Sequence, residues 1–317
     1  GEIMLKDLLE TKHCFKLVCG AGNEDVEEIK RLVYIYAIAG CRFFDLSANE
    51  EVIAAAREAL DLAKVYDAYL CVSVGIKNDP HVKKAVIDYE RCVNCGSCEE
   101  ICPQGAIHYA KVKREKCIGC GRCWKICSRA AISYISEEKD LSEVLPPIVE
   151  KGIDCIEFHA MGTDEEEIYS KWKYINENYE GLLSICTSRG QLSDEMLVER
   201  IKKMIESRED YTTIIQADGF PMSGGDDNYK STLQAVATAE IVMNAKLPVY
   251  LVLSGGTNSK TTELARMCDI SYHGVAIGSY ARKIVNRYTN RPDFWKNPNV
   301  LNSALELAKP LVDSVIL

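Results

Sequence analysis

The chain has 317 residues, enough for one large core or for two domains, and 47% of them are hydrophobic, as in an ordinary globular protein. A formal net charge of minus nine argues against nonspecific binding to nucleic acid or to an anionic membrane. No apolar run reaches the roughly 18 residues of a membrane helix and the first residues lack a signal-peptide pattern, so we expect a soluble, cytoplasmic protein without membrane insertion.

Apolar β-rich runs alternate with amphipathic helical stretches along most of the chain. In chain order the predicted strands cover residues 15–20, 41–48, 68–75, 153–160, 182–188, 211–219, 248–256 and 272–279. The predicted helices cover residues 24–39, 49–66, 139–151, 163–178, 193–207, 229–245, 258–268 and 279–288. Eight such units predict a (β/α)8 barrel of the TIM type, with a doubly wound open sheet as the alternative.

A further amphipathic helix is predicted over residues 297–317. It either closes the barrel or meets another subunit of a homo-oligomer, and the sequence leaves both open. We assign residues 1–87 and 137–317 to the barrel and residues 88–136 to an insert between the third strand and its helix.

Two cysteine runs with the same Cys-x2-Cys-x2-Cys-x3-Cys spacing dominate the insert. Their members are Cys92, Cys95, Cys98 and Cys102 in the first run, and Cys117, Cys120, Cys123 and Cys127 in the second. Fifteen cysteines without a secretion signal favour metal ligation over disulfides. The flanking segments repeat too, and the whole stretch resembles the bacterial 2[4Fe-4S] ferredoxin domain, although Ser128 stands where a proline usually follows the second run.

In two-cluster ferredoxins the fourth cysteine of each run binds the other cluster. By this rule one [4Fe-4S] cluster takes Cys92, Cys95, Cys98 and Cys127, and the other takes Cys102, Cys117, Cys120 and Cys123. Two structural zinc sites are the alternative, which two complete runs with an internal repeat disfavour. Fully ligated clusters of this kind move electrons and leave no iron for a substrate.

The insert falls in a loop that follows a strand, and such loops form the catalytic face of a barrel. The clusters are therefore placed to deliver electrons to a site at the barrel mouth. The alternative is that the insert occupies a tolerant loop and serves only a redox protein partner. The insert carries eight basic and five acidic side chains, which partly offset the charge of bound clusters.

Glycines after the seventh and eighth strands predict a phosphate site. These residues are Gly255, Gly256, Gly278 and Ser279. Exposed backbone N–H groups at this place in a barrel bind FMN or phosphorylated substrates, although glycine also simply fits tight turns. After the sixth strand a long loop contains Asp218, Gly224 and Gly225, and a loop of this length indicates ligand binding.

Other polar residues lie at predicted strand ends. His159 suits acid–base chemistry and Arg189 suits anion binding, while Asp218 is a candidate base or hydrogen-bond acceptor. Because charges inside a barrel need partners, Lys16, Asp45 and Glu157 are expected to form a buried ion network. Cys19, Cys71 and Cys186 are expected to pack as small apolar side chains.

Three stretches resemble the light-dependent period protein LdpA family: residues 15–40, 215–240 and 251–282. The resemblance runs from about residue 12 to about residue 285, with both cysteine runs where that family has its clusters. It implies [4Fe-4S] binding and redox sensing without a settled reaction. Two functions are the main hypotheses: an oxidoreductase that feeds electrons to a phosphate-bearing cofactor or substrate such as FMN, and a non-enzymatic regulator that signals cluster state to a protein partner. An electron carrier with an inert barrel is a third, which eight βα units with specialised loops disfavour.

Overall fold

The computed structural model describes residues 4–76, 83–136, 139–190, 192–219 and 229–317, with side chains from residue 232 in the last range. Eight parallel strands close into a barrel in the spatial order β1-β12-β11-β10-β9-β8-β3-β2. Their bounds are β1 Cys14–Val18, β2 Phe43–Ser47, β3 Tyr69–Gly75, β8 Cys155–His159, β9 Leu182–Thr187, β10 Thr213–Asp218, β11 Tyr250–Ser254 and β12 Gly274–Ile277. All eight predicted strands are confirmed, and the pairing of β1 with β12 excludes an open sheet.

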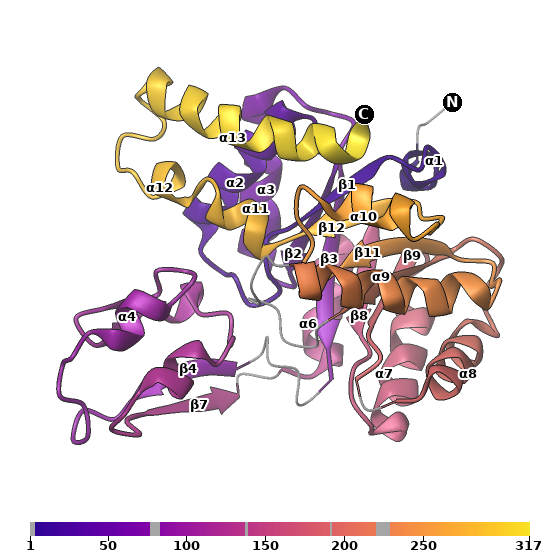
Figure 1. Ribbon diagram of the computed structural model, residues 1–317, viewed down its shortest axis with the longest axis horizontal. Helices are drawn as coiled ribbons and strands as arrows, with labels where there is room; N and C mark the ends of the chain where they lie inside the picture. Colours follow the sequence, from indigo (N-terminus) through magenta and orange to yellow (C-terminus); the bar gives the residue numbers. More distant parts are fainter. Residues whose placement is uncertain (1–3, 77–82, 137–138, 191, 220–228) are drawn as a thin grey trace.

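Helices follow the strands and surround the barrel (Figure 1). They are α2 Val26–Ala39, α3 Glu50–Ala63, α6 Leu141–Glu150, α7 Glu165–Asn178, α8 Asp194–Ile205, α9 Tyr229–Asn244, α10 Thr261–Met267 and α11 Ser279–Lys283. Several begin at polar caps, such as Asn49, whose side chain accepts two backbone N–H groups of α3. The helix predicted over residues 279–288 is two short helices, α11 and α12 Asn286–Thr289, separated by the β-branched residues Ile284 and Val285.

The barrel interior is apolar at one end and polar at the other. At the amino ends of the strands, Phe43, Tyr250 and other inward side chains pack with Leu5 and Leu9 of α1 Leu5–Glu10, which seals that end. The sequence pattern does not predict α1, because a helix of six residues shows little periodicity. Polar side chains are buried nearer the carboxyl ends, where functional groups of such barrels lie.

The C-terminal helix, α13 Pro298–Ile316, lies across α2 (Figure 1). Val312 and Ile316 approach Gly40, the left-handed residue that ends α2. The helix predicted over residues 297–317 therefore packs on α2, a helix of the same barrel. Among the described helices none has the length and hydropathy to cross a bilayer.

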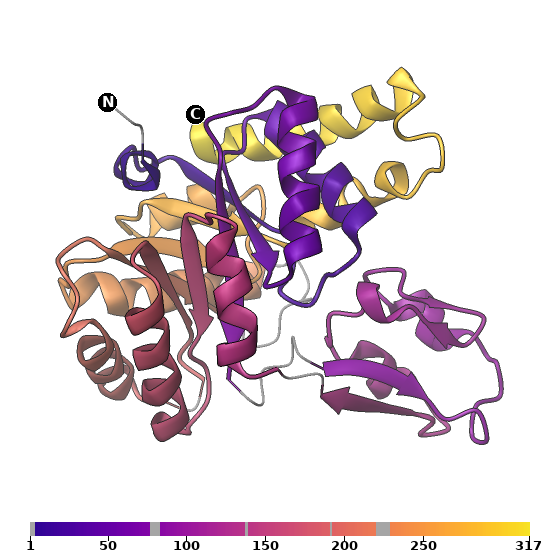
Figure 2. The same cartoon turned by 180° about the vertical axis from the view of Figure 1, so that it is seen from behind.

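The cysteine-rich insert forms a separate lobe beside the barrel, seen from both sides in Figures 1 and 2. It follows β3 and precedes α6, so it occupies the third loop between a strand and its helix. Its elements are β4 Lys83–Ile87, α4 Ser97–Ile101, β5 Ile107–His108, β6 Lys111–Val112, the 3-10 turn Arg114–Lys116, α5 Arg122–Ile126 and β7 Ile132–Ser136. β4 pairs with β7, and β5 pairs with β6, in two antiparallel ribbons. The lobe therefore begins with β4, before residue 88, where the sequence assignment starts the insert.

Candidate functional site

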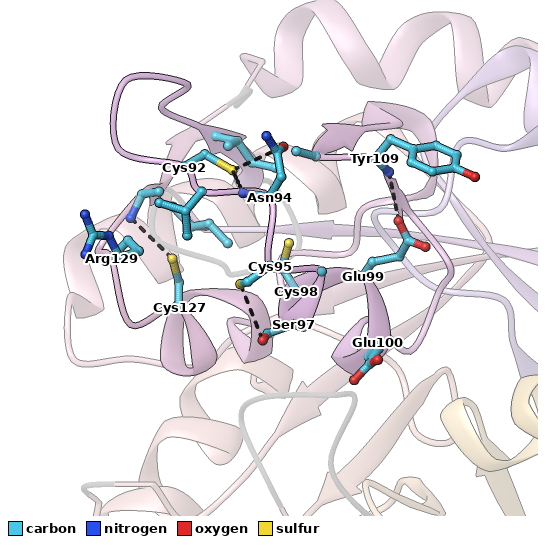
Figure 3. Close-up of a pocket in the computed structure, with 16 residues that line it drawn as sticks. Cys92, Asn94, Cys95, Ser97, Cys98, Glu99, Glu100, Tyr109, Cys127 and Arg129 are labelled. Carbon is cyan, nitrogen blue, oxygen red and sulfur yellow. Dashed lines mark hydrogen bonds between the residues drawn. The ribbon is translucent and has the colours of Figure 1, made fainter.

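The eight cysteines of the insert line two cavities. The outer set, around a cavity of about 500 Å³, consists of Cys92, Cys95, Cys98 and Cys127. The inner set lines a second, smaller cavity and consists of Cys102, Cys117, Cys120 and Cys123. Figure 3 shows the sulfurs of the outer set turned toward one space. Each set therefore combines three cysteines of one run with the last cysteine of the other, which is the crossed arrangement inferred from the spacing.

Backbone N–H groups point at the sulfur atoms in a repeated pattern. The amide of Ala106 donates to Sγ of Cys102 at 3.4 Å, and the amide of Ala131 donates to Sγ of Cys127 at 3.4 Å. In each run the donor follows the last cysteine by four residues, so the internal repeat of the sequence becomes a repeat of donors. Such N–H groups stabilise the negative charge of thiolates that bind iron.

The two sets differ in one aromatic hydroxyl. The hydroxyl of Tyr134, after the second run, lies 3.5 Å from Sγ of Cys123 in the inner set. The residue at the same place after the first run is Tyr109, and 91% of its side chain is exposed. The outer set instead has the hydroxyl of Ser97 at 3.5 Å from Sγ of the exposed Cys95. The repeat therefore gives the two sets different polar surroundings.

The spacing of the thiols fits a cluster better than a single zinc ion. Four thiolates around one zinc ion at about 2.3 Å would lie about 3.8 Å from one another. Within the described residues, the one set of three ligand atoms found within 4.8 Å of one another belongs to Glu157, His159 and Cys186, outside the insert. Thiols held farther apart, around cavities with apolar walls of residues such as Ile87 and Ile107, suit a larger iron-sulfur core.

The inner set lies against the barrel. The ammonium of Lys84 in β4 donates to the carbonyl of Cys117 at 2.6 Å and to that of Gly22, in the barrel loop after β1, at 2.7 Å. The amide of Glu24 in the same loop donates to the carbonyl of Glu115 at 2.8 Å. These bonds hold the second cysteine run at the carboxyl ends of the barrel strands.

Two further contacts tie the same side of the insert to the barrel. Nε of Arg282 in α11 donates to Gln104 at 3.2 Å, while its Nη1 donates to the carbonyl of Val18 at 2.6 Å. The ammonium of Lys116 pairs with Asp25, the cap of α2, at 2.7 Å. Arg282 is 5% exposed, so its planar guanidinium is a fixed part of the junction.

A cleft of about 570 Å³ lies between the insert and the barrel. Its barrel wall includes Ser47, Ser73 and Gly75 at the ends of β2 and β3, and its insert wall includes Lys84 and Arg114. This volume is typical of small-molecule sites. Acidic side chains line it as well: Glu24, Glu50, Glu51 and Glu143. The cleft therefore surrounds one space beside the inner set with polar strand ends and with side chains of both charges.

Three charged side chains form the expected buried network inside the barrel: Lys16, Asp45 and Glu157. The ammonium of Lys16 lies 2.5 Å from Oε1 of Glu157 and 2.7 Å from Oε1 of Gln216. The hydroxyl of Ser73 donates to Asp45 at 2.7 Å and lies 3.4 Å from Oε2 of Glu157. The result is a buried polar layer below the barrel mouth.

Burial and neighbouring charges shift the pKa values of this layer. Burial, together with the nearby Glu157 carboxylate, raises the pKa of Asp45 to about 6. Burial alone would raise the pKa of Glu157, but the Lys16 ammonium and the His159 imidazole hold it below its usual range. Burial alone would lower the pKa of Lys16, and the Glu157 carboxylate raises it well above normal. Glu157 is thus ionised at neutral pH.

The predicted catalytic residues are not all brought together. His159 is buried, with Nε2 at 3.2 Å from Oε2 of Glu157, and Asp218 ends β10 with Oδ2 at 3.8 Å from Sγ of Cys186. Arg189 instead points to the surface, where it pairs with Asp194 of α8 at 3.1 Å and both side chains are 54% exposed. His159 and Asp218 therefore share the barrel mouth, and Arg189 lies at its rim.

The predicted phosphate glycines form tight turns at the same end of the barrel. Gly255 and Gly256 have φ values of +76° and +71°, and a side chain at Gly255 would collide with the Asp218 carboxylate. A side chain at Gly278 would crowd Arg282 and Val18. The described lining of the cleft does not include these glycines or Ser279, the first residue of α11. Gly224 and Gly225 lie outside the described residues.

Several residues at the junction and in the polar layer were missed by sequence reasoning. Lys84, Gln104 and Arg282 look like ordinary surface residues in the sequence, and burial by the neighbouring lobe gives them their role. Gln216 could have been predicted from the sequence, because it lies two residues before Asp218 on the same strand and therefore points to the same side.

The comparisons with known sequences match both parts of the chain. The family model of the light dependent period A C-terminal domain matches residues 147–314. The 4Fe-4S binding domain model matches twice, over residues 85–108 and 110–133, and these ranges contain all eight cysteines. Light dependent period A from Synechococcus elongatus is 31% identical over 332 aligned positions, covering 96% of this chain and 92% of that protein.

Solved structures share the barrel architecture at low sequence identity. Tryptophan synthase from M. tuberculosis aligns with a TM-score of 0.51 at 12% identity, covering 99% of this chain and 97% of that one. (S)-3-O-geranylgeranylglyceryl phosphate synthase from Thermoplasma acidophilum aligns with a TM-score of 0.47 at 9% identity, with 99% of each chain covered. At 12% identity, the similarity to tryptophan synthase supports the barrel fold and says nothing about function.

Proposed function

The chain belongs to the light dependent period A family and carries two 4Fe-4S binding motifs, and from this we propose that it is an oxidoreductase-like iron-sulfur redox protein whose barrel mouth takes electrons from the insert. The outer and inner sets are the proposed ligands of two [4Fe-4S] clusters. A cluster bound by such a set supplies one electron at a time. A phosphate-bearing cofactor or substrate, FMN being one example, is the proposed recipient.

The position of the inner set supports this proposal most strongly. Lys84 links the carbonyl of Cys117 directly to the barrel loop at Gly22, and Arg282 links the loop after Cys102 to β1. The cleft beside these bonds is open to a small molecule. Buried charged side chains at the junction would not be expected if the insert merely occupied a loop that tolerates insertions, because burying a charge costs free energy unless it is paired.

The cleft carries charges of both signs, and the glycine turns lie outside its described lining. Lys84 and Arg114 line the insert side, Arg114 pairs with Glu24 at 3.2 Å, and Glu50 and Glu51 line the barrel side. The Gly255–Gly256 turn follows β11 at the carboxyl ends of the barrel strands. We propose that the Gly255–Gly256 turn, with Gly278 and Ser279, holds phosphate, and that His159 and Asp218 face the reacting part of the ligand. Their roles there would be to orient it and to exchange protons near neutral pH.

An anaerobic preparation tests the proposal. We expect about eight iron and eight sulfide per chain, together with a phosphate-bearing small molecule that native mass spectrometry detects and identifies. Electrons supplied to the protein should reach this molecule in the native chain and fail to reach it when Cys98 and Cys102 are both replaced by alanine. Full iron content with no phosphate ligand, bound or added, would count against the barrel half of the proposal.

A second candidate is a regulator that reports redox state to a protein partner, as the family resemblance implies. The observation that favours it is the polar junction, where Lys116 and Asp25 form an ion pair that a change in neighbouring charge can weaken. For this function, partner capture should differ between oxidised and reduced protein while no small molecule is reduced. Equal capture in both states would argue against it.

We also propose a cytoplasmic location. None of the fifteen cysteines forms a disulfide, including the buried thiols within the barrel. A reducing compartment preserves that state. Thiol labelling of the protein in intact cells checks this, because an oxidising compartment would yield disulfides.

A further inference from the structure

We propose that the barrel mouth holds a mononuclear divalent transition metal, zinc or a similar cation, ligated by Glu157, His159 and Cys186. This goes beyond the proposed redox function, because it gives the barrel a Lewis-acid site separate from the insert. It also revises the expectation that Cys186 is merely a small apolar side chain. The three ligand atoms lie within 4.8 Å of one another, and no other such set occurs in the described residues.

Strand pairing brings these side chains together. Glu157 and His159 lie two residues apart on β8, so both point into the barrel. His159 is the register partner of Cys186 on β9. Nε2 of His159 lies 3.2 Å from Oε2 of Glu157, close to the roughly 3.4 Å between ligand atoms around a tetrahedral zinc ion.

The remaining contacts hold the ligands in place. Lys16 and Ser184 bind Oε1 of Glu157, at 2.5 and 3.0 Å, and so fix the carboxylate. Its second oxygen lies 3.2 Å from Nε2 of His159, 3.3 Å from Nε2 of Gln216 and 3.4 Å from the Ser73 hydroxyl. Side chains around a metal site usually orient the ligands in this way. Because Asp45 and Glu157 are two buried carboxylates near one ammonium, a cation beside them would also reduce the negative charge of the layer.

The donor types indicate the class of metal. Imidazole nitrogen, thiolate sulfur and carboxylate oxygen together suit zinc and its first-row neighbours, and do not suit Mg²⁺ or Ca²⁺, which prefer oxygen alone. Three protein ligands leave a fourth position, as in catalytic zinc sites. Asp218 lies close to the three ligands, with Oδ2 at 3.8 Å from Sγ of Cys186. A carbonyl or a water molecule bound there would be polarised beside a carboxylate.

Zinc content and X-ray absorption at the zinc edge test the site in cluster-loaded protein. We expect one zinc per chain after equilibration with Zn²⁺ and removal of the excess, with one sulfur at about 2.3 Å and nitrogen or oxygen neighbours at about 2.0–2.1 Å. The iron of the insert does not contribute to this edge. Zinc surrounded by four sulfurs, or no zinc in protein with full iron content, would overturn the proposal.

Variants locate the ion. Cys186→Ala and His159→Gln should each weaken zinc binding at least about tenfold with iron unchanged. Cys14→Ala is the matched control, because Cys14 is a buried thiol on β1 in the apolar layer, and it should keep the zinc. Unchanged zinc in both ligand variants would disprove the assignment, and if either fails to fold the wild-type spectrum alone decides. Since no electron transfer is measured, this test and that of the redox function can fail independently.

Discussion

The outer and inner cysteine sets come from one repeated sequence and lie in different surroundings. The inner set has Cys117 and Cys123 buried and is linked through Lys84 and Gln104 to the barrel. The outer set includes the exposed Cys95 and opens on a cavity of about 500 Å³. Identical spacing can supply the same ligands twice, but the neighbouring domain decides which set faces a barrel site and which faces solvent.

The largest expected effect is the loss of one cluster, or of both, when cysteines of the inner set alone or of both sets are replaced. Replacing Cys102 and Cys117 by alanine removes two ligands of the inner set alone, so iron should fall from about eight to about four per chain. Replacing Cys98 and Cys102 removes one ligand from each set, and iron should fall close to zero. Iron and sulfide analysis of anaerobic samples measures both.

The two double variants act as controls for each other. They share Cys102 and remove the same number of thiols, so a general loss of stability would affect them alike. If each run ligated its own cluster, the results would be exchanged, with more iron in the Cys98/Cys102 variant. That outcome would disprove the crossed assignment of the outer and inner sets.

A smaller effect is expected where Lys84 joins the inner set to the barrel. Lys84→Met keeps the aliphatic stem and removes the ammonium that two carbonyls accept from, which should lower the free energy of unfolding by about 2 kcal/mol. Urea unfolding under anaerobic conditions measures it. Lys111→Met, an exposed position in β6 of the same lobe, should change stability by less than about 0.5 kcal/mol. Equal effects would mean that Lys84 does not hold the two parts together.

The repeated units of the fold can be predicted from the sequence, and the contacts between distant segments cannot. Alternating apolar runs and helices predicted the eight strands, because each unit carries its own periodicity. The short α1 has too few residues for a periodic signal, although Leu5 and Leu9 seal the barrel. Val285 interrupts the last predicted helix, which a window average over residues 279–288 conceals.

The candidate sites divide in the same way. The cysteine spacing predicted eight candidate ligands, since the residues of each run are close in the sequence. Lys16, Asp45 and Glu157 were foreseen as a network, because buried charges need partners. The role of Arg282 was not foreseen, because its contacts with Gln104 and Val18 join segments 178 and 264 residues away along the chain. No local pattern carries such a contact.

The smallest predicted effect uses the internal repeat as its own control. Tyr134→Phe removes a hydroxyl 3.5 Å from Sγ of Cys123 and should lower the reduction potential of the inner cluster by roughly 20–60 mV, about 1 kcal/mol for one electron. Tyr109→Phe, at the same place after the first run, should leave both potentials unchanged because Tyr109 lines the outer cavity with its hydroxyl turned away from the sulfurs (Figure 3). A redox titration followed by electron paramagnetic resonance measures each variant. Equal shifts in the two variants would show that the repeat, and not the packing around the inner set, determines the potentials.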